Sequence, residues 1–196
     1  MAKNFEFFFD VGSSYSYIAY KALPNFAAAH GAEIVWRPML LGGVFKATGN
    51  HSPADVPAKM RWLSQDLLRW ARRYGVPFIQ NPNFPINTLT MMRGAVGMQM
   101  RGQGFRKYLE AIFHAMWGEP RNLGQPDELA AVLRAAGFDA EAFMALVNDP
   151  AVKEQLKQNT EEAVARGVFG APTFFVGEDM FWGQDRLDFV AAALVG

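Results

Sequence analysis

The chain of 196 residues contains no cysteine. It therefore forms no disulfide, ligates no iron–sulfur cluster and offers no thiol nucleophile of its own. Any thiol chemistry performed here has to use a thiol from another molecule. A cysteine-free chain tolerates any redox environment, so this absence indicates no particular compartment.

An excess of charge is also missing, because 19 Lys and Arg residues balance 19 Asp and Glu residues. No basic stripe stands out, which argues against non-specific nucleic-acid binding. The three histidines, His30, His51 and His114, are scattered without the spacing of metal ligands. We therefore expect no metal site.

Long hydrophobic runs are absent as well. No apolar stretch approaches the roughly 20 residues that span a bilayer. The apolar run in MAKNFEFFFD is shorter than the roughly 7–15 residues of a secretory segment, and no small-residue cleavage site follows it. We expect a soluble cytoplasmic protein that binds no membrane.

Hydrophobic residues nevertheless make up 51% of the chain, enough for one well-buried domain. Residues 5–9 (FEFFF) predict a buried strand, and the spacing of apolar residues predicts a helix over 14–30 that stops at Gly31. Residues 33–37 predict a second strand, limited by Pro38. Strand, helix and strand within about 35 residues are typical of a right-handed βαβ unit.

The middle of the chain is almost continuously helical. Residues 42–57, rich in Gly, Pro, Asn and Ser, predict a loop. We predict helices at 58–74, 88–100 (capped by Thr88), 105–117, 127–136, 139–147 and 150–166, then strands at 173–176 and 180–182 and a helix at 185–195. We expect core packing or a dimer face for Met91, Met92, Met98 and Met100, and core or interface positions for Trp62, Trp70, Trp117 and Trp182.

Three polar features mark the ends of these elements. Ser13 and Ser16 lie where the first helix opens, Ala171-Pro172 precedes an apolar strand, and Gln184-Asp185 follows the last hairpin. Each alone has a structural reading, as a helix cap or a strand start. Together they match a thioredoxin-like domain, in which a later cis-proline packs beside a reactive pair at the start of the first helix. We predict an α/β thioredoxin-like fold with a DsbA-type all-helical insertion at 58–166, between thioredoxin-like segments 1–57 and 167–196.

Four stretches point to one family: FFFDVGSSYSYIA, GNHSPADVPAKMRWLSQDLLRWARRYGVPF, VFGAPTFFVGEDMFWGQDRL and, more loosely, FPINTLTMMR. In these stretches the chain resembles the glutathione-dependent 2-hydroxychromene-2-carboxylate isomerases and, more distantly, the kappa-class glutathione transferases. The resemblance implies cis–trans isomerisation of an aromatic-degradation intermediate, 2-hydroxychromene-2-carboxylate, to trans-o-hydroxybenzylidenepyruvate. It also implies glutathione as cofactor and a homodimer.

The resemblance assigns roles to residues. Ser13 is the catalytic partner of the glutathione sulfur and Ser16 a secondary hydroxyl. Asn50 holds one end of the tripeptide, and Ala171, with Pro172, pairs with its cysteinyl unit. Asp185, with Gln184, takes the γ-glutamyl ammonium and carboxylate. The substrate pocket is expected between the insertion helices and the 42–57 loop, where Lys46, Lys59 and Arg61 are low-ranked candidates to meet a substrate carboxylate.

Two points stay open. Ser14 stands where the family commonly has proline, so either Ser13 or Ser14 could face the thiol. The function also has two alternatives. The first is a kappa-type glutathione transferase, and the second is a non-catalytic thioredoxin-like module that binds peptides.

Overall fold

A four-stranded sheet with the strand order β2-β1-β3-β4 forms the centre of the molecule. The structure is a computed structural model that describes residues 3–195. Strand β1 (Lys3–Phe9) pairs in parallel with β2 (Ala32–Pro38) and antiparallel with β3 (Thr173–Val176), which pairs antiparallel with β4 (Asp179–Trp182). The helices are α1 (Ser14–His30), α2 (Leu41–Thr48), α3 (Pro57–Tyr74), α4 (Leu89–Met100), α5 (Phe105–Phe113), α6 (Pro126–Ala135), α7 (Ala140–Asn148), α8 (Pro150–Ala165) and α9 (Leu187–Val195).

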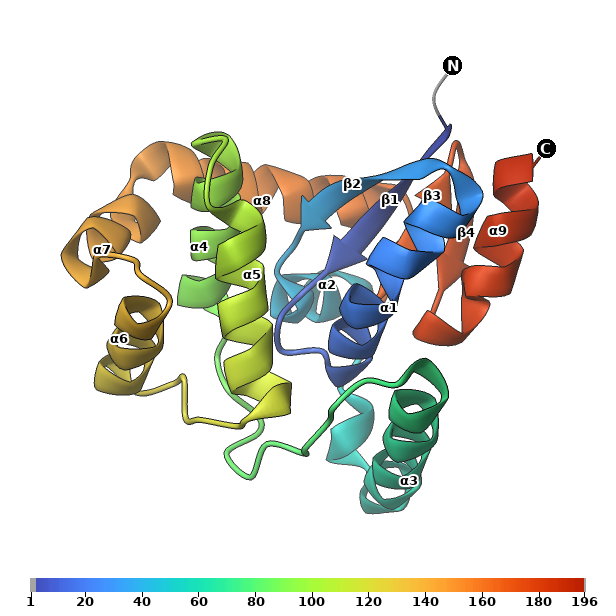
Figure 1. Cartoon of the computed structure of the whole chain (residues 1–196), viewed down its shortest axis with the longest axis horizontal. Coiled ribbons are helices and arrows are strands. Elements are labelled where there is room, and N and C mark those ends of the chain that lie inside the picture. The colour runs from blue at the N-terminus through green and yellow to red at the C-terminus, as the bar shows by residue number, and fades with distance from the viewer. Residues whose placement is uncertain (1–2, 196) are drawn as a thin grey trace.

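The alternation of side chains along β1 builds a core on each face of the sheet. Phe5, Phe7 and Phe9 point into the larger core, where Phe7 stacks on Phe174 at 5.4 Å between ring centroids. Phe8 points to the other face and packs in a smaller cluster with residues of α2 and α8. Figure 1 shows the result, with α1 and α9 on one face of the sheet and α2 and α8 on the other.

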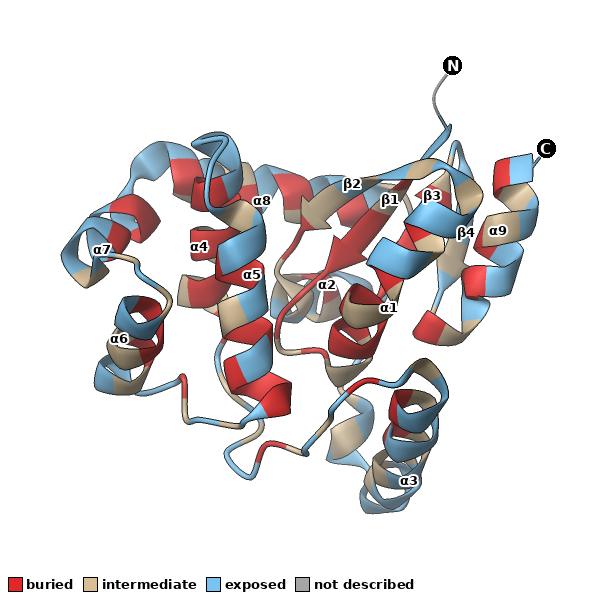
Figure 2. Ribbon diagram, viewed as in Figure 1, coloured by how far each residue is buried: buried red, intermediate tan, exposed pale blue. Residues whose placement is uncertain are grey.

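The helices between β2 and β3 differ in how deeply they are buried (Figure 2). In α4 the buried positions include Met91, Met92 and Met98, which confirms them as core residues, whereas Met100 is exposed. In α3 only Leu67 and Ala71 are buried. The fold class predicted from the sequence is confirmed, and the boundaries at 57/58 and 166/167 stay a prediction.

The tryptophans divide in the same way. Trp117 is fully buried and stacks against Phe78 at 6.0 Å, as expected of a core residue. Trp70 is half-buried, and Trp62 and Trp182 are exposed. The core prediction is therefore wrong for Trp62 and Trp182, and an interface role for either one stays a prediction.

Two local predictions were wrong. The loop expected at 42–57 contains helix α2 and a 3-10 turn, Pro53–Asp55. Helix α2 forms despite Gly42-Gly43 because its Val44 is buried and the N–H of Leu41 donates to Asp10 Oδ2 at 2.8 Å. Thr88 does not cap α4 through its side chain, because its hydroxyl donates to Asp10 instead (3.0 Å).

The predicted helix at 105–117 is helical throughout but changes its type. Helix α5 ends at Phe113, and a π-helical turn, His114–Gly118, completes the segment. Within residues 3–195, no helix combines the length and the apolar character needed to cross a membrane.

Candidate active site

Ser13 lies at the N-terminus of α1 and faces the residue before Pro172. Its hydroxyl accepts a hydrogen bond from the backbone N–H of Ser16 (3.1 Å) and donates one to the carbonyl oxygen of Ala171 (3.0 Å). The Ala171–Pro172 peptide bond is cis. The serine and the proline loop, 158 residues apart in the chain, are therefore joined by a direct hydrogen bond.

The neighbouring serines lie differently. Ser16 is fully buried, and its hydroxyl has no hydrogen-bond partner among the described residues. Ser14 is half-buried, and its hydroxyl makes no hydrogen bond within residues 3–195. Of the three hydroxyls, that of Ser13 reaches the proline loop. The burial of Ser16 argues against direct contact between its side chain and a ligand.

The loop before the cis peptide bond is held from two directions. Asn50, which is exposed, donates from Nδ2 to the carbonyl of Phe169 at 2.8 Å. On the other side, the N–H of Gly183 donates to the carbonyl of Pro172 (3.0 Å). A Cβ atom at Gly170 would lie 2.6 Å from Nε1 of Trp182, so a side chain at this position would displace the Trp182 ring. Asn50 and the Ala171–Pro172 pair thus belong to one rigid loop cluster.

Gln184 and Asp185 each act on a tyrosine, Gln184 on Tyr74 of α3 and Asp185, through its charge, on Tyr15 in the first turn of α1. Gln184 is buried and its carbonyl accepts a hydrogen bond from the hydroxyl of Tyr74 (3.0 Å). The side chain of Asp185 is 34% exposed. Burial raises the pKa of Tyr15, and its hydrogen bond to Asp66 (2.9 Å) and the charges of Asp66 and Asp185 raise it further. Tyr15 is therefore a permanent donor to Asp66, in the field of the Asp185 carboxylate.

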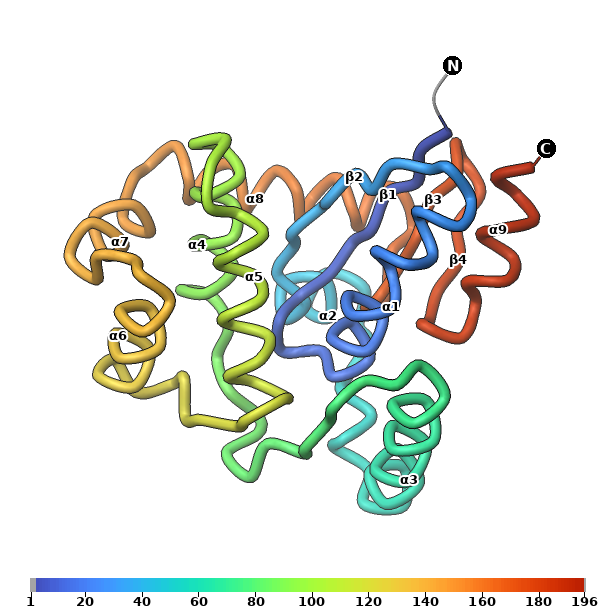
Figure 3. Tube along the Cα trace, viewed as in Figure 1, coloured from blue at the N-terminus to red at the C-terminus, as the bar shows by residue number. Residues whose placement is uncertain are grey.

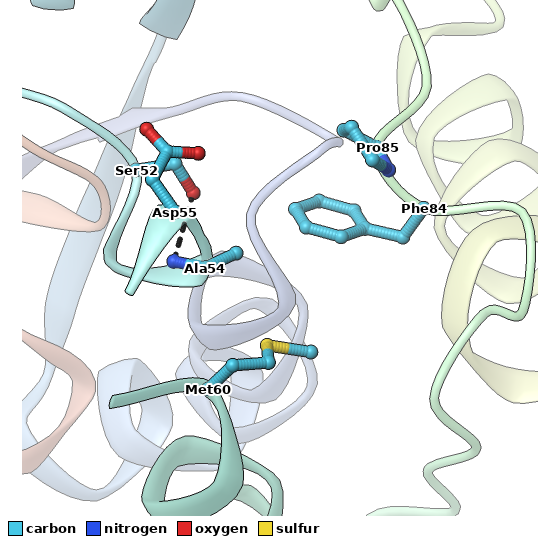
Figure 4. A pocket seen from close by; sticks show the side chains of 6 residues that line it. All are labelled: Ser52, Ala54, Asp55, Met60, Phe84 and Pro85. Atoms are coloured by element: carbon cyan, nitrogen blue, oxygen red, sulfur yellow. Dashed lines mark hydrogen bonds between the residues drawn. The ribbon is translucent and has the colours of Figure 1, made fainter. Parts of the chain in front are cut away.

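A small cavity of about 230 Å³ opens beside this region. Figure 4 shows its walls, formed by Phe84 and Pro85 on one side and by the 3-10 turn and Met60 on the other. The turn contributes Ala54 and Asp55, and Ser52, directly before it, completes the lining. An apolar cavity of about 150 Å³ holds benzene, so this space suits one substituted ring.

The connection from α3 to α4, which supplies Phe84 and Pro85, passes the N-terminal end of α1 (Figure 3). It is attached there at two points. The hydroxyl of Tyr17 donates to the carbonyl of Pro77 (2.7 Å), and Thr88 donates to Asp10 (3.0 Å). The connection that supplies Phe84 and Pro85 to the cavity is therefore attached both to α1 and to Asp10.

The role of the three candidate cations toward a substrate carboxylate stays a prediction. Lys46, Lys59 and Arg61 are all exposed, and none forms an ion pair with another residue of the described range. Among residues 3–195, no group of three or more His, Cys, Asp or Glu side chains is placed to hold a metal ion.

Sequence reasoning missed Asp10, a 1% exposed carboxyl that accepts three hydrogen bonds behind the serine turn. The signal was present, because an acidic residue directly after an apolar strand is buried only when it has partners.

Comparisons with known proteins agree over the full chain. The family model of the DSBA-like thioredoxin domain matches residues 5–195. The 2-hydroxychromene-2-carboxylate isomerase of Sphingobium xenophagum is 34% identical over 198 residues, covering 100% of both chains. Human glutathione S-transferase kappa 1 is 26% identical, covering 99% of this chain and 92% of its own.

A solved structure of a 2-hydroxychromene-2-carboxylate isomerase superposes with a TM-score of 0.86 at 33% identity, covering 98% of this chain and 94% of that one. Sequence, fold and length therefore agree, and this chain belongs to the family of 2-hydroxychromene-2-carboxylate isomerases, enzymes built on the DSBA-like thioredoxin fold.

Proposed function

We propose that this enzyme isomerises 2-hydroxychromene-2-carboxylate to trans-o-hydroxybenzylidenepyruvate with glutathione as cofactor. One observation carries the proposal: a serine hydroxyl at a helix N-terminus lies 3.0 Å from the carbonyl before a cis-proline, in a chain without cysteine. Such a site has the donors that a thiolate needs but no thiol of its own. A peptide thiol bound beside Ala171 fits this donor set.

When bound, glutathione would supply a thiolate that adds reversibly to the conjugated double bond and leaves after rotation about the resulting single bond. Ser13 would donate a hydrogen bond to the sulfur, and hydrogen bonding to the charged form lowers a thiol pKa that is ordinarily about 8.5. The N-terminus of α1 adds positive potential, worth about 0.3–2 kcal/mol depending on burial.

The remaining residues would hold the tripeptide. The carbonyl of Ala171 would accept from the cysteinyl N–H, and Asp185 would pair with the γ-glutamyl ammonium, next to Gln184. Asn50, which is hydrogen-bonded to the carbonyl of Phe169, would hold one end of the tripeptide, and Ser16 would act through the backbone N–H that it donates to Ser13.

The cavity beside Phe84 and Met60 is our candidate for the aromatic ring of the substrate. Phe84→Ala should raise the KM for the substrate about tenfold or more, since truncating a buried aromatic contact costs more than 1.4 kcal/mol. The affinity for glutathione should stay the same. Ile79→Ala, which truncates an exposed residue of the same connection, is the matched control.

The test of the function begins with calorimetric titration of the purified protein with glutathione. Thiolates absorb near 240 nm. In the complex this absorbance should appear at a lower pH than it does for free glutathione. Turnover of hydroxychromene carboxylate should require glutathione and fail with S-methylglutathione, which has the same shape but no free thiol. Turnover without any thiol would overturn the proposed cofactor.

A kappa-type transferase is the second candidate, favoured by the 26% identity with human glutathione S-transferase kappa 1. Mass spectrometry of the product separates the two, because an isomer keeps the substrate's mass and a conjugate gains that of glutathione. We further propose a cytoplasmic homodimer, as the family resemblance implies. Light scattering on the purified protein tests the dimer.

A further inference from the structure

Three helices begin around one buried carboxyl group, that of Asp10. The N–H of Gly12, two residues before α1, donates to Oδ1 at 2.8 Å. The N–H of Leu41, the first residue of α2, donates to Oδ2 at 2.8 Å, and the hydroxyl of Thr88, directly before α4, donates to the same oxygen at 3.0 Å. The carboxyl group thus joins the N-terminal ends of α1, α2 and α4.

No cation balances this group: within residues 3–195, Asp10 takes part in no ion pair. Burial raises the pKa of Asp10, and its three hydrogen bonds lower that pKa in part. Helix N-termini carry partial positive charge and stabilise an acidic group without a side-chain cation. Asp10 thus accepts one hydrogen bond from a group at or next to the N-terminus of each of the three helices.

The turn that follows Asp10 is held by further hydrogen bonds and by a close contact with Thr88. The N–H of Ser13 donates to the carbonyl of Asp10 (3.0 Å), and Trp117 Nε1 donates to the carbonyl of Val11 (2.8 Å). A Cβ atom on Gly12 would lie 2.8 Å from the Thr88 methyl group, so the turn and Thr88 are in close contact. The position of the Ser13 hydroxyl therefore depends on where Asp10 holds the turn.

We propose that Asp10 is a positioning residue, whose carboxyl group ties the serine turn to Leu41 and Thr88 and so aligns the Ser13 hydroxyl with a thiol bound beside Ala171. Asp10 is 1% exposed, so it acts through Ser13 and touches no ligand. The thiol part of this inference rests on the proposed function, and the alignment part does not.

The substitution Asp10→Asn tests the role with little change in size. A carboxyl group presents an acceptor oxygen to Gly12 and another to Leu41, whereas an amide has one oxygen and an NH2 group that only donates. One of the two backbone N–H groups would face that NH2 group. The turn has to move to relieve this contact, and Ser13 moves with it.

The environment of position 13 can be measured without glutathione through the pKa of a cysteine placed there, because the chain has no cysteine of its own. In a Ser13→Cys variant the new thiol is the sole one, and its rate of alkylation by iodoacetamide against pH gives its pKa. A helix N-terminus lowers a cysteine pKa. Adding Asp10→Asn should raise the pKa of the thiol at position 13 by about one unit, as the thiolate loses its alignment with the N–H of Ser16.

The sign of the change in the thiol pKa distinguishes a positioning role of Asp10 from a purely electrostatic effect of its charge. Removing a nearby negative charge alone would lower the pKa of this thiol, and a bystander carboxyl would leave it unchanged. Either result overturns the proposal. Asp139→Ala is the matched control, since it deletes the hydrogen bond of another carboxylate to a helix N-terminus, that of α7 (2.8 Å to the N–H of Ala142). It should lower Tm and leave the thiol pKa as it was.

A second variant covers the case in which Asp10→Asn does not fold. Thr88→Val removes one of the three donors and keeps the carboxyl group and both backbone donors. It should shift the pKa of the thiol at position 13 in the same direction by a smaller amount. An unchanged pKa in folded Thr88→Val would then overturn the proposal.

With Ser13 in place, Asp10→Asn should lower kcat about tenfold while the Kd for glutathione stays within a few-fold. Failure of the unsubstituted protein to bind glutathione would overturn the proposed function and leave the alkylation result standing. Glutathione-dependent turnover together with an unshifted thiol pKa at position 13 would overturn the positioning role alone.

Discussion

The hydroxyl of Ser13 has a single proton, and the protein itself uses it. That proton is donated to the carbonyl of Ala171, the same carbonyl proposed to accept from the cysteinyl N–H of glutathione. Binding would therefore exchange partners: the ligand's N–H takes over the carbonyl, and the serine proton becomes free for the sulfur. In the structure the two groups are each other's hydrogen-bond partner.

This exchange predicts the behaviour of Ser13→Ala. The variant should bind glutathione within a few-fold of the original affinity, because most tripeptide contacts remain. The pKa of the bound thiol should rise and turnover should fall, since the sulfur loses its hydroxyl donor. The pH–rate profile and the absorbance at 240 nm measure both effects. Ser14→Ala should change neither, and a larger effect of Ser14→Ala would mean that Ser14 and not Ser13 donates to the sulfur.

Asp185 allows a second test at the same scale. Asp185→Ala should weaken glutathione binding at least about tenfold, because a hydrogen bond to a charged group is worth about 1.5–3 kcal/mol. Asp188→Ala, an exposed carboxylate three residues further on, is the control and should bind as before. Calorimetry measures both. Unchanged affinity in a folded Asp185→Ala variant would mean that the γ-glutamyl group binds elsewhere.

Among the elements, α4 depends on its glycines. A Cβ atom at Gly94 would lie 2.3 Å from the Tyr108 hydroxyl oxygen and 2.6 Å from the Phe143 ring. The helix can approach α5 and α7 this closely because Gly94 has no side chain. Glycine is otherwise a poor helix former, so these contacts outweigh its local cost.

Gly94→Ala should accordingly lower the free energy of unfolding by about 1–3 kcal/mol, the usual cost of overpacking a core. Gly42→Ala is the matched comparison, since Gly42 is an exposed helical glycine with nothing within 4 Å of its Cβ position. That variant should gain about 0.5–1 kcal/mol. Denaturant titration measures both, and equal effects would contradict the packing argument.

The sequence predicts those helices and strands whose residues contact near neighbours in the chain or follow a regular apolar spacing. The Ser13 turn and the Ala171–Pro172 pair could be predicted because each has its own motif. Helix α2 could not be predicted, since its start depends on Asp10, 31 residues away. In the sequence Gly43 indicates a loop, and only the structure shows that Thr160 lies 3.1 Å from its Cβ position. The same holds for Thr88, whose partner is 78 residues distant.

For the whole molecule, Asp10 predicts how stability depends on pH. Its pKa is raised above the ordinary value of 3.8, so the folded protein holds this proton more tightly than the unfolded chain. The resulting stabilisation is complete below pH 3.8 and is lost as the pH rises through the folded pKa. In Asp10→Asn the side chain at position 10 does not titrate. Relative to this variant, the free energy of unfolding of the unsubstituted protein should fall as the pH rises from about 4. Denaturant titrations across this range measure the difference, and a pH-independent difference would contradict it.

The buried methionines bear on how the protein withstands oxidants. Without cysteine, thioethers are the sulfur groups that an oxidant can attack. Met91, Met92 and Met98 are shielded in α4, and so are Met39 and Met116, whereas Met100, Met144 and Met180 are exposed. Peroxide should therefore convert the surface methionines to sulfoxides first and leave the core intact. With glutathione as the proposed cofactor, catalysis in a stressed cell would then depend on the supply of reduced glutathione and on Met60, the half-buried methionine that lines the cavity.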